Sequence, residues 1–214
     1  MTMRIHCWLS GLALILGGLM ATVSHLIATD APADPALLQQ YMRSGVSLHL
    51  LLFAGGVLVL LGWFGQYALQ SAASGVTGFV TFLSIFIGIL FGDLLHCVLE
   101  FSIFPILTSS VPYALPSLAD TCYHLTPFAI LLRIGGLLIL AGVPATVCSL
   151  LRSHILPRWS AAPFVLTSIL LATAMIPRLE SSFGAFSLAA LYTSMTILGM
   201  ALMLSAHRSA SPVL

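Results

Sequence analysis

Six long apolar stretches limit what this chain can fold into, because each is long enough to form a transmembrane helix. Such a helix needs about 20 mostly apolar residues to cross a hydrocarbon core about 30 Å thick. The stretches lie at about 8–28, 45–67, 76–104, 127–150, 161–177 and 184–205. Only 6% of the residues are charged, whereas a soluble domain carries about 25%. The sequence therefore predicts a single all-α domain, residues 1–214, folded as a bundle of six transmembrane helices.

The arginines predict how this bundle is oriented. Cytoplasmic loops of membrane proteins carry an excess of basic residues, and the chain contains no lysine. With six spans, one side of the membrane holds Arg4, Arg152, Arg158 and Arg208, and the other holds Arg43 and Arg178. We therefore expect both termini to be cytoplasmic. We also expect a multi-pass protein of the cell membrane, of the type found in bacterial inner membranes.

The start of the chain allows a second interpretation. The segment "MTMRIHCWLSGLALILGG" has the basic start and apolar run of a signal peptide, and "ATDAPADPA" could contain a cleavage site. The apolar run is longer than the usual hydrophobic region of about 7–15 residues, and His25 lies near its end. We therefore expect a retained helix. Cleavage would leave five helices.

Three ionisable side chains lie inside the third apolar stretch, in the sequence "FGDLLHCVLEF" at 91–101. On an α-helix with 100° per residue, Asp93, His96 and Glu100 fall within about 60° of one another. A charged side chain at the centre of a bilayer costs at least about 2.5 kcal/mol on insertion scales. We therefore expect all three to face into the bundle.

Arg133, in the fourth stretch, is the predicted partner of Glu100. At 1.5 Å per residue, Glu100 lies about 7 Å below Pro105, and Arg133 lies about 9 Å below Pro127. The two charges would then have similar depths on consecutive antiparallel helices. Because an unpaired charge in the membrane is costly and the guanidinium suits a carboxylate, the sequence predicts an ion pair.

A row of small residues, Ser84, Gly88 and Gly92, precedes the polar face and would let a neighbouring helix approach closely. We expect this row to close the cytoplasmic half of the bundle and the polar half to form a pocket open to the outside. His25 and His49 would lie near its mouth. The candidate binding residues are therefore Asp93, His96, Glu100, Arg133, His49 and His25.

Histidines in the outer half also allow a metal or haem site, since imidazole binds transition metals and haem iron. The candidate ligands are His25, His49, His96 and His124. His25 and His49 are shallow, however, and no HxxxH or CxxCH motif accompanies them. We therefore expect no cofactor, and keep haem as an alternative.

The sequence narrows the function to three classes. It contains no GxSxG, HExxH, P-loop or dinucleotide fingerprint, which argues against the common enzyme classes. A net charge of +1 gives no basic patch for nucleic acid. The remaining classes are a small-solute or proton-coupled membrane protein, a haem or metal protein, and a structural or accessory subunit. The last would use its ion pairs to hold helices together in a homo-oligomer or membrane complex.

Three segments carry a resemblance to a known group of proteins. They are "HLIATDAP", "LHLLLFAGGVLVLLGWFGQYALQ" and "GFVTFLSIFIGILFGDLLHCVLEFSIFPIL". Over about residues 1–110 the chain resembles a broad group of uncharacterised bacterial multi-pass membrane proteins. In that group a histidine opens the second helix and an acidic residue precedes a proline near the end of the third, here His49, Glu100 and Pro105. The resemblance implies a membrane fold and no particular activity.

Overall fold

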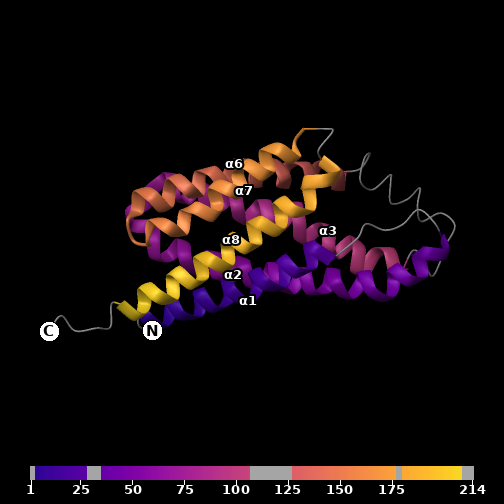
Figure 1. Cartoon of the computed structure of the whole chain (residues 1–214), viewed down its shortest axis with the longest axis horizontal. Coiled ribbons are helices and arrows are strands. Elements are labelled where there is room, and N and C mark those ends of the chain that lie inside the picture. Colours follow the sequence, from indigo (N-terminus) through magenta and orange to yellow (C-terminus); the bar gives the residue numbers. More distant parts are fainter. Residues whose placement is uncertain (1–2, 28–34, 107–126, 177–179, 209–214) are drawn as a thin grey trace.

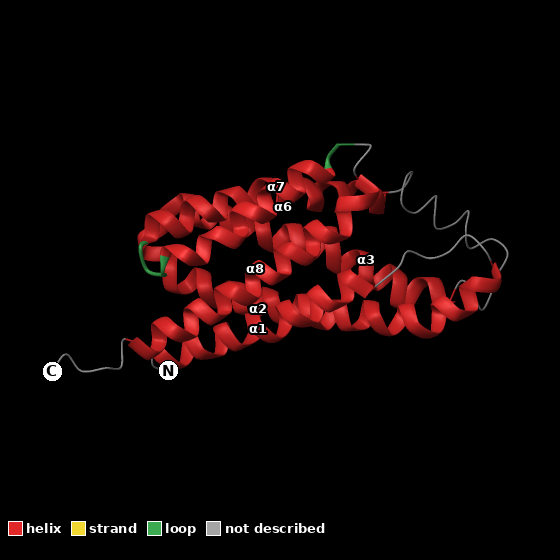
Figure 2. Cartoon of the chain, in the orientation of Figure 1, coloured by secondary structure: helices red, strands yellow, loops and turns green. Residues whose placement is uncertain are grey.

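The computed structural model describes residues 3–27, 35–106, 127–176 and 180–208, and these ranges are helical except for short turns (Figures 1 and 2). Its elements are α1 (Met3–Ile27), α2 (Pro35–Ile89), the π-helix η1 (Leu90–Leu94), α3 (Leu95–Val98), the π-helix η2 (Leu99–Ile103), α6 (Pro127–Ser153), the 3₁₀-helix η4 (Arg158–Ala161), α7 (Ala162–Ala174) and α8 (Glu180–Arg208). No strand occurs within the described ranges. The predicted all-α class is confirmed.

Four of the described helices are long and apolar enough to cross a membrane. They are Arg4–Ile27, Ser44–Ile106, Pro127–Ser153 and Gly184–His207. The prediction of six separate spans is not supported in that form. The stretches predicted at 45–67 and 76–104 fall within one segment, Ser44–Ile106, which is interrupted by a non-helical residue at Gly75. The helix α7 has only 13 residues, fewer than a typical span needs.

The long helix α2 folds back on itself at Gly75. This residue has φ 54° and ψ −145°, a conformation that side-chain-bearing residues rarely adopt. On either side of it the chain runs antiparallel: Trp63 Nε1 donates to the carbonyl oxygen of Phe82 at 3.3 Å, and the Tyr67 ring stacks on that of Phe82 at 4.6 Å. Residues 35–106 therefore form a helical hairpin, which Figure 1 shows running to one end of the bundle and returning.

Small residues bring the hairpin against α6. A Cβ atom on Gly135 would overlap the backbone of Gly92, and one on Gly88 would lie 2.8 Å from Cγ1 of Ile139. The predicted close approach of a helix to the row Ser84, Gly88 and Gly92 is therefore confirmed, and the neighbour is α6. Such contacts maximise van der Waals packing where lipid provides no hydrophobic driving force.

The helix α1 packs between α2 and α8, again through glycines. A Cβ atom on Gly17 would lie 2.5 Å from the carbonyl oxygen of Gly55 in α2, and one on Gly18 would lie 2.6 Å from the carbonyl oxygen of Tyr192 in α8. The large side chains buried in the middle of the bundle include Trp63, Tyr192, Phe104 and Phe164. These packed helices fix the positions of the polar groups described below.

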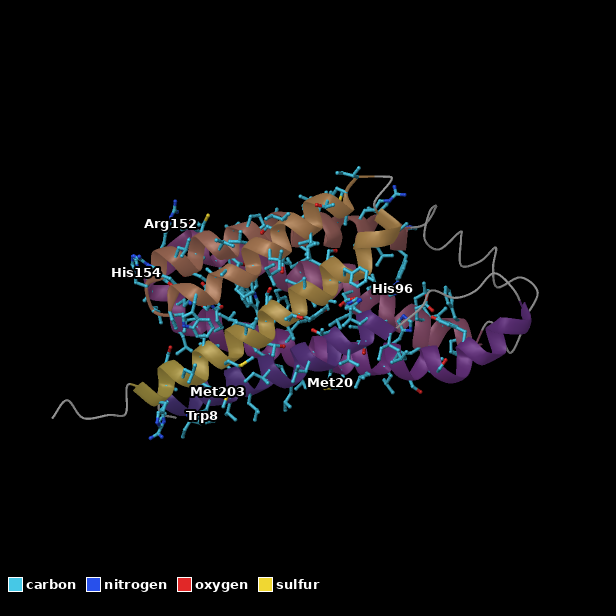
Figure 3. All side chains as sticks on the ribbon, in the orientation of Figure 1. Trp8, Met20, His96, Arg152, His154 and Met203 are labelled. Carbon is cyan, nitrogen blue, oxygen red and sulfur yellow. The ribbon has the colours of Figure 1, made fainter. Side chains whose placement is uncertain are left out.

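One end of the bundle carries the start of α1, the end of α8 and the turn between α6 and α7 (Figure 1). Figure 3 places Arg152 and His154 at this same end, with Trp8 and Met203. The side chains of Arg4, Arg152 and Arg158 are all exposed. Basic residues that are far apart in the sequence therefore gather at one end.

Candidate functional site

Asp93 lies where three helices meet. Its side chain is buried, with 2% of the residue exposed. Oδ2 lies 3.3 Å from Nε2 of His25 on α1, and it also accepts a hydrogen bond from the hydroxyl of Tyr192 on α8. The His25 and Tyr192 rings stack with centroids 5.5 Å apart. Two donors on one oxygen compensate for the loss of water around a buried carboxyl group.

Glu100 is bound by a tyrosine and not by the predicted arginine. It is 3% exposed, and its Oε2 accepts a hydrogen bond from the Tyr41 hydroxyl at 2.5 Å. Among the described residues no ion pair joins Glu100 to Arg133, whose side chain is exposed. The prediction failed because equal depth does not fix rotation. The α6 face that meets the hairpin contains Gly135, and Arg133 lies about 200° around the helix from it.

Two histidines lie between these carboxyl groups. Nδ1 of His49, which is buried, donates to the carbonyl oxygen of Gly45 at 2.8 Å. The His49 ring lies 5.5 Å from the His96 ring and 6.3 Å from the Tyr41 ring. His96, labelled on α3 in Figure 3, interacts electrostatically with Asp93. The histidines therefore connect the surroundings of Glu100 with those of Asp93.

These groups form one cluster, which we call the titratable network: Tyr41, His49, Asp93, His96, Glu100, His25 and Tyr192. It brings together five of the six residues predicted from the sequence, and Arg133 lies outside it. The residues of the network belong to α1, to both arms of the hairpin and to α8. Each of these helices contributes at least one titratable side chain.

Both carboxyl groups lie in π-helical turns. Asp93 belongs to η1 and Glu100 to η2, with a single turn of α3 between them. The expected arc assumed a uniform α-helix, whereas a π-turn contains an extra residue and rotates the side chains that follow it. Such turns are rare and are often found at functional sites.

The two tyrosines were not predicted. Tyrosines near helix ends fit an interfacial belt, yet Tyr192 is fully buried and Tyr41 is 5% exposed. Tyr41 precedes the second apolar stretch, which begins at about 45, whereas α2 begins at Pro35 and therefore includes Tyr41. The available signal was Pro35 itself, since proline is favoured in the first turn of a helix.

The candidate metal ligands do not converge in the part of the chain that is described. Within it, no group of three or more His, Cys, Asp or Glu side chains is arranged to hold a metal ion. His25 and His49 contact different partners, Asp93 and the Gly45 carbonyl oxygen. His124 lies outside the described residues.

Two cavities are lined by residues outside the titratable network. The larger, about 520 Å³, lies between α6, α7 and α8 and includes Arg133. The smaller, about 10 Å³, lies between the hairpin and α6, near Gln66, Gln70 and Thr146. In the described residues, Gln70 Nε2 is the buried side-chain polar atom that lacks a hydrogen-bond partner.

Comparisons with known proteins provide no relative from which a role could be transferred. No family model, curated protein or solved structure matches this chain. The resemblance to bacterial multi-pass proteins therefore rests on the sequence segments quoted above. The case for a function depends on the geometry of the site.

Proposed function

We propose that the chain crosses the cell membrane six times and has both termini in the cytoplasm. The fold at Gly75 supports two crossings by residues 44–106. Together η4 and α7 extend from Arg158 to Ala174, close to the lower limit of about 17 residues for a span. The arginines near the chain termini and the α6–α7 turn then lie on the cytoplasmic side, as the positive-inside rule requires.

We propose that the titratable network binds and releases protons, and that the protein is a proton-coupled membrane protein. The observation that carries this proposal is the contact of His25 and Tyr192 with one oxygen of buried Asp93. Histidine is the side chain whose ordinary pKa lies nearest neutrality. A histidine–carboxyl pair inside a membrane therefore provides a place where a proton can be held and exchanged.

The order of the groups supports proton movement along the network. Glu100 contacts Tyr41, whose ring is near His49, and His49 is near His96. The ring centroids are 6.3 Å apart for Tyr41 and His49 and 5.5 Å apart for His49 and His96, so neighbouring rings are close enough for a proton to pass directly or through one water molecule.

A structural role is the second candidate, and hydrogen bonding provides an argument for it. Among the described residues, the buried side-chain atoms of Asp93 and Glu100 all have partners. Fully paired buried polar groups also fix how helices dock and which arrangement of helices is stable. In that case the protein would be an accessory or structural subunit, and its network would not change protonation in the working pH range.

Infrared difference spectra recorded against pH separate the two candidates. For the purified protein in lipid, we expect a carboxyl or imidazole band to change between about pH 5 and 8. Asp93→Asn should remove or shift this change. Thr167→Val is the matched control, because it deletes a buried, non-titrating contact between Thr167 and Ser194 of 2.9 Å. Spectra of folded protein that do not vary over this range would favour the structural role.

A further inference from the structure

A mostly apolar cavity in the described bundle lies apart from the titratable network. It has a volume of about 520 Å³, within the range of about 300–1,000 Å³ that is typical of small-molecule sites. Its lining comes mostly from leucines and small residues: Gly136, Leu137 and Leu140 of α6, Leu171, Ala174 and Met175 at the end of α7, and Gly184, Ser187 and Leu188 of α8.

The cavity lies beside the end of the short helix α7. This helix packs against both α6 and α8 and ends at Ala174, which lines the cavity. Gly136 and Gly184 have no side chains to fill the space, and a Cβ atom on either would meet nothing within 4 Å. Among the described residues an apolar volume is thereby left unfilled, beside the start of α6 and the start of α8.

Arg133 is the charged residue in the lining of this cavity. It is exposed, and among the described residues it forms no ion pair. The other polar side chain in the lining, that of Ser187, donates its hydroxyl to the carbonyl oxygen of Gly184 in its own helix. Arg133 lies about 9 Å along the helix from Pro127, close enough to the helix end for its long side chain to reach the headgroup region.

We propose that this cavity binds an acyl chain of an anionic membrane lipid, with Arg133 bound to the phosphate of its headgroup. The apolar lining fits hydrocarbon, and the exposed guanidinium presents donors in a fork that matches two phosphate oxygens. Charge complementarity selects an anionic headgroup, while the size of the cavity selects a chain and not a small free ion. The bound lipid completes the packing of α6, α7 and α8 that the short α7 leaves unfinished.

Native mass spectrometry of the purified protein provides the test. Phosphatidylglycerol and phosphatidylcholine with identical acyl chains are titrated, and inorganic phosphate is added as a competitor. We expect tighter binding of phosphatidylglycerol, and about a tenfold loss of this binding in Arg133→Gln, as for one charge-assisted hydrogen bond. Arg152→Gln, at the other end of the same helix and also exposed, is the matched control and should bind like the wild type.

A second variant tests the cavity independently of the charge. Gly136→Leu should occupy the cavity, because a Cβ there meets nothing within 4 Å, and should weaken binding of both lipids, while the lipid-free protein unfolds at the wild-type temperature or slightly above it. Equal effects of Arg133→Gln and Arg152→Gln would overturn the proposal. So would displacement of the lipid by inorganic phosphate, or a Gly136→Leu variant that changes only the monomer–dimer ratio. The last result would identify a second copy of the chain as the occupant.

Discussion

His25 and Asp93 are 68 residues apart in the sequence, yet Nε2 of His25 lies 3.3 Å from Oδ2 of Asp93. The contact joins α1 to the returning arm of the hairpin. The hydroxyl of Tyr192, which belongs to α8, donates a hydrogen bond to the same oxygen. Three helices thus share one buried carboxyl group. Because water is excluded here, replacing His25 or Asp93 leaves the other residue as a buried polar group that has lost a hydrogen-bond partner.

A double-mutant cycle should measure this contact. We expect His25→Phe, which keeps an aromatic ring to stack on Tyr192, to lower the free energy of unfolding by about 2–4 kcal/mol. Asp93→Asn should have a comparable effect, and the double variant should cost less than the sum. Equilibrium unfolding in detergent micelles gives these values. Strictly additive losses would show that the two residues do not interact.

Adjacent glycines on α6 should respond in opposite ways to alanine. At Gly135 the new Cβ would overlap the backbone of Gly92, so the helices must separate, at a cost of about 1–3 kcal/mol. At Gly136 a Cβ meets nothing within 4 Å, and alanine should stabilise the helix by up to about 1 kcal/mol. Thermal unfolding of the two variants checks this. Equal shifts would mean that α6 does not pack as described.

The sequence was sufficient to predict the helical membrane class and the crowding of polar groups around Asp93. The free energy of inserting a helix into a membrane is approximately a sum over its residues. The length of an apolar segment and the presence of a charge within it therefore predict a span and its buried face from the local sequence. The small-residue row at Gly88 and Gly92 likewise predicted a close helix contact. These features depend on one helix at a time.

Features that depend on two helices at once could not be predicted in the same way. Depth along a helix suggested Arg133 as the partner of Glu100, but the rotation of α6 is set by Gly135 packing on Gly92. The partner of Glu100 is Tyr41 in place of Arg133. Tyr41 can reach Glu100 because α2 starts at Pro35 and therefore includes Tyr41. Nothing in the local sequence marks the π-turns that orient both carboxyl groups.

Removing the Tyr41 hydroxyl should weaken the site at Glu100. Tyr41→Phe keeps the ring beside His49 but removes the hydrogen bond to Glu100. We expect a loss of about 1–2 kcal/mol in the free energy of unfolding, as for a buried hydrogen bond within a membrane. Tyr67→Phe is the matched control, because its ring packs on Phe82 and substitution should change stability by less than about 0.5 kcal/mol. Equal losses would exclude a specific role for the Tyr41 hydroxyl.

Gln70, at the far end of the hairpin from the titratable network, should be replaceable without loss. It is 2% exposed, and its Nε2 has no partner among the described residues, so it carries an uncompensated desolvation cost of about 1–3 kcal/mol. Methionine has nearly the same length and no polar donor, so Gln70→Met should leave the unfolding temperature unchanged or raise it. Thr146→Val is the comparison, because its hydroxyl donates to the carbonyl oxygen of Gly142 at 2.8 Å and its loss should be mildly destabilising.

The neighbouring cavity of about 10 Å³ has roughly the volume that one water molecule needs. A marked destabilisation by Gln70→Met would contradict the prediction.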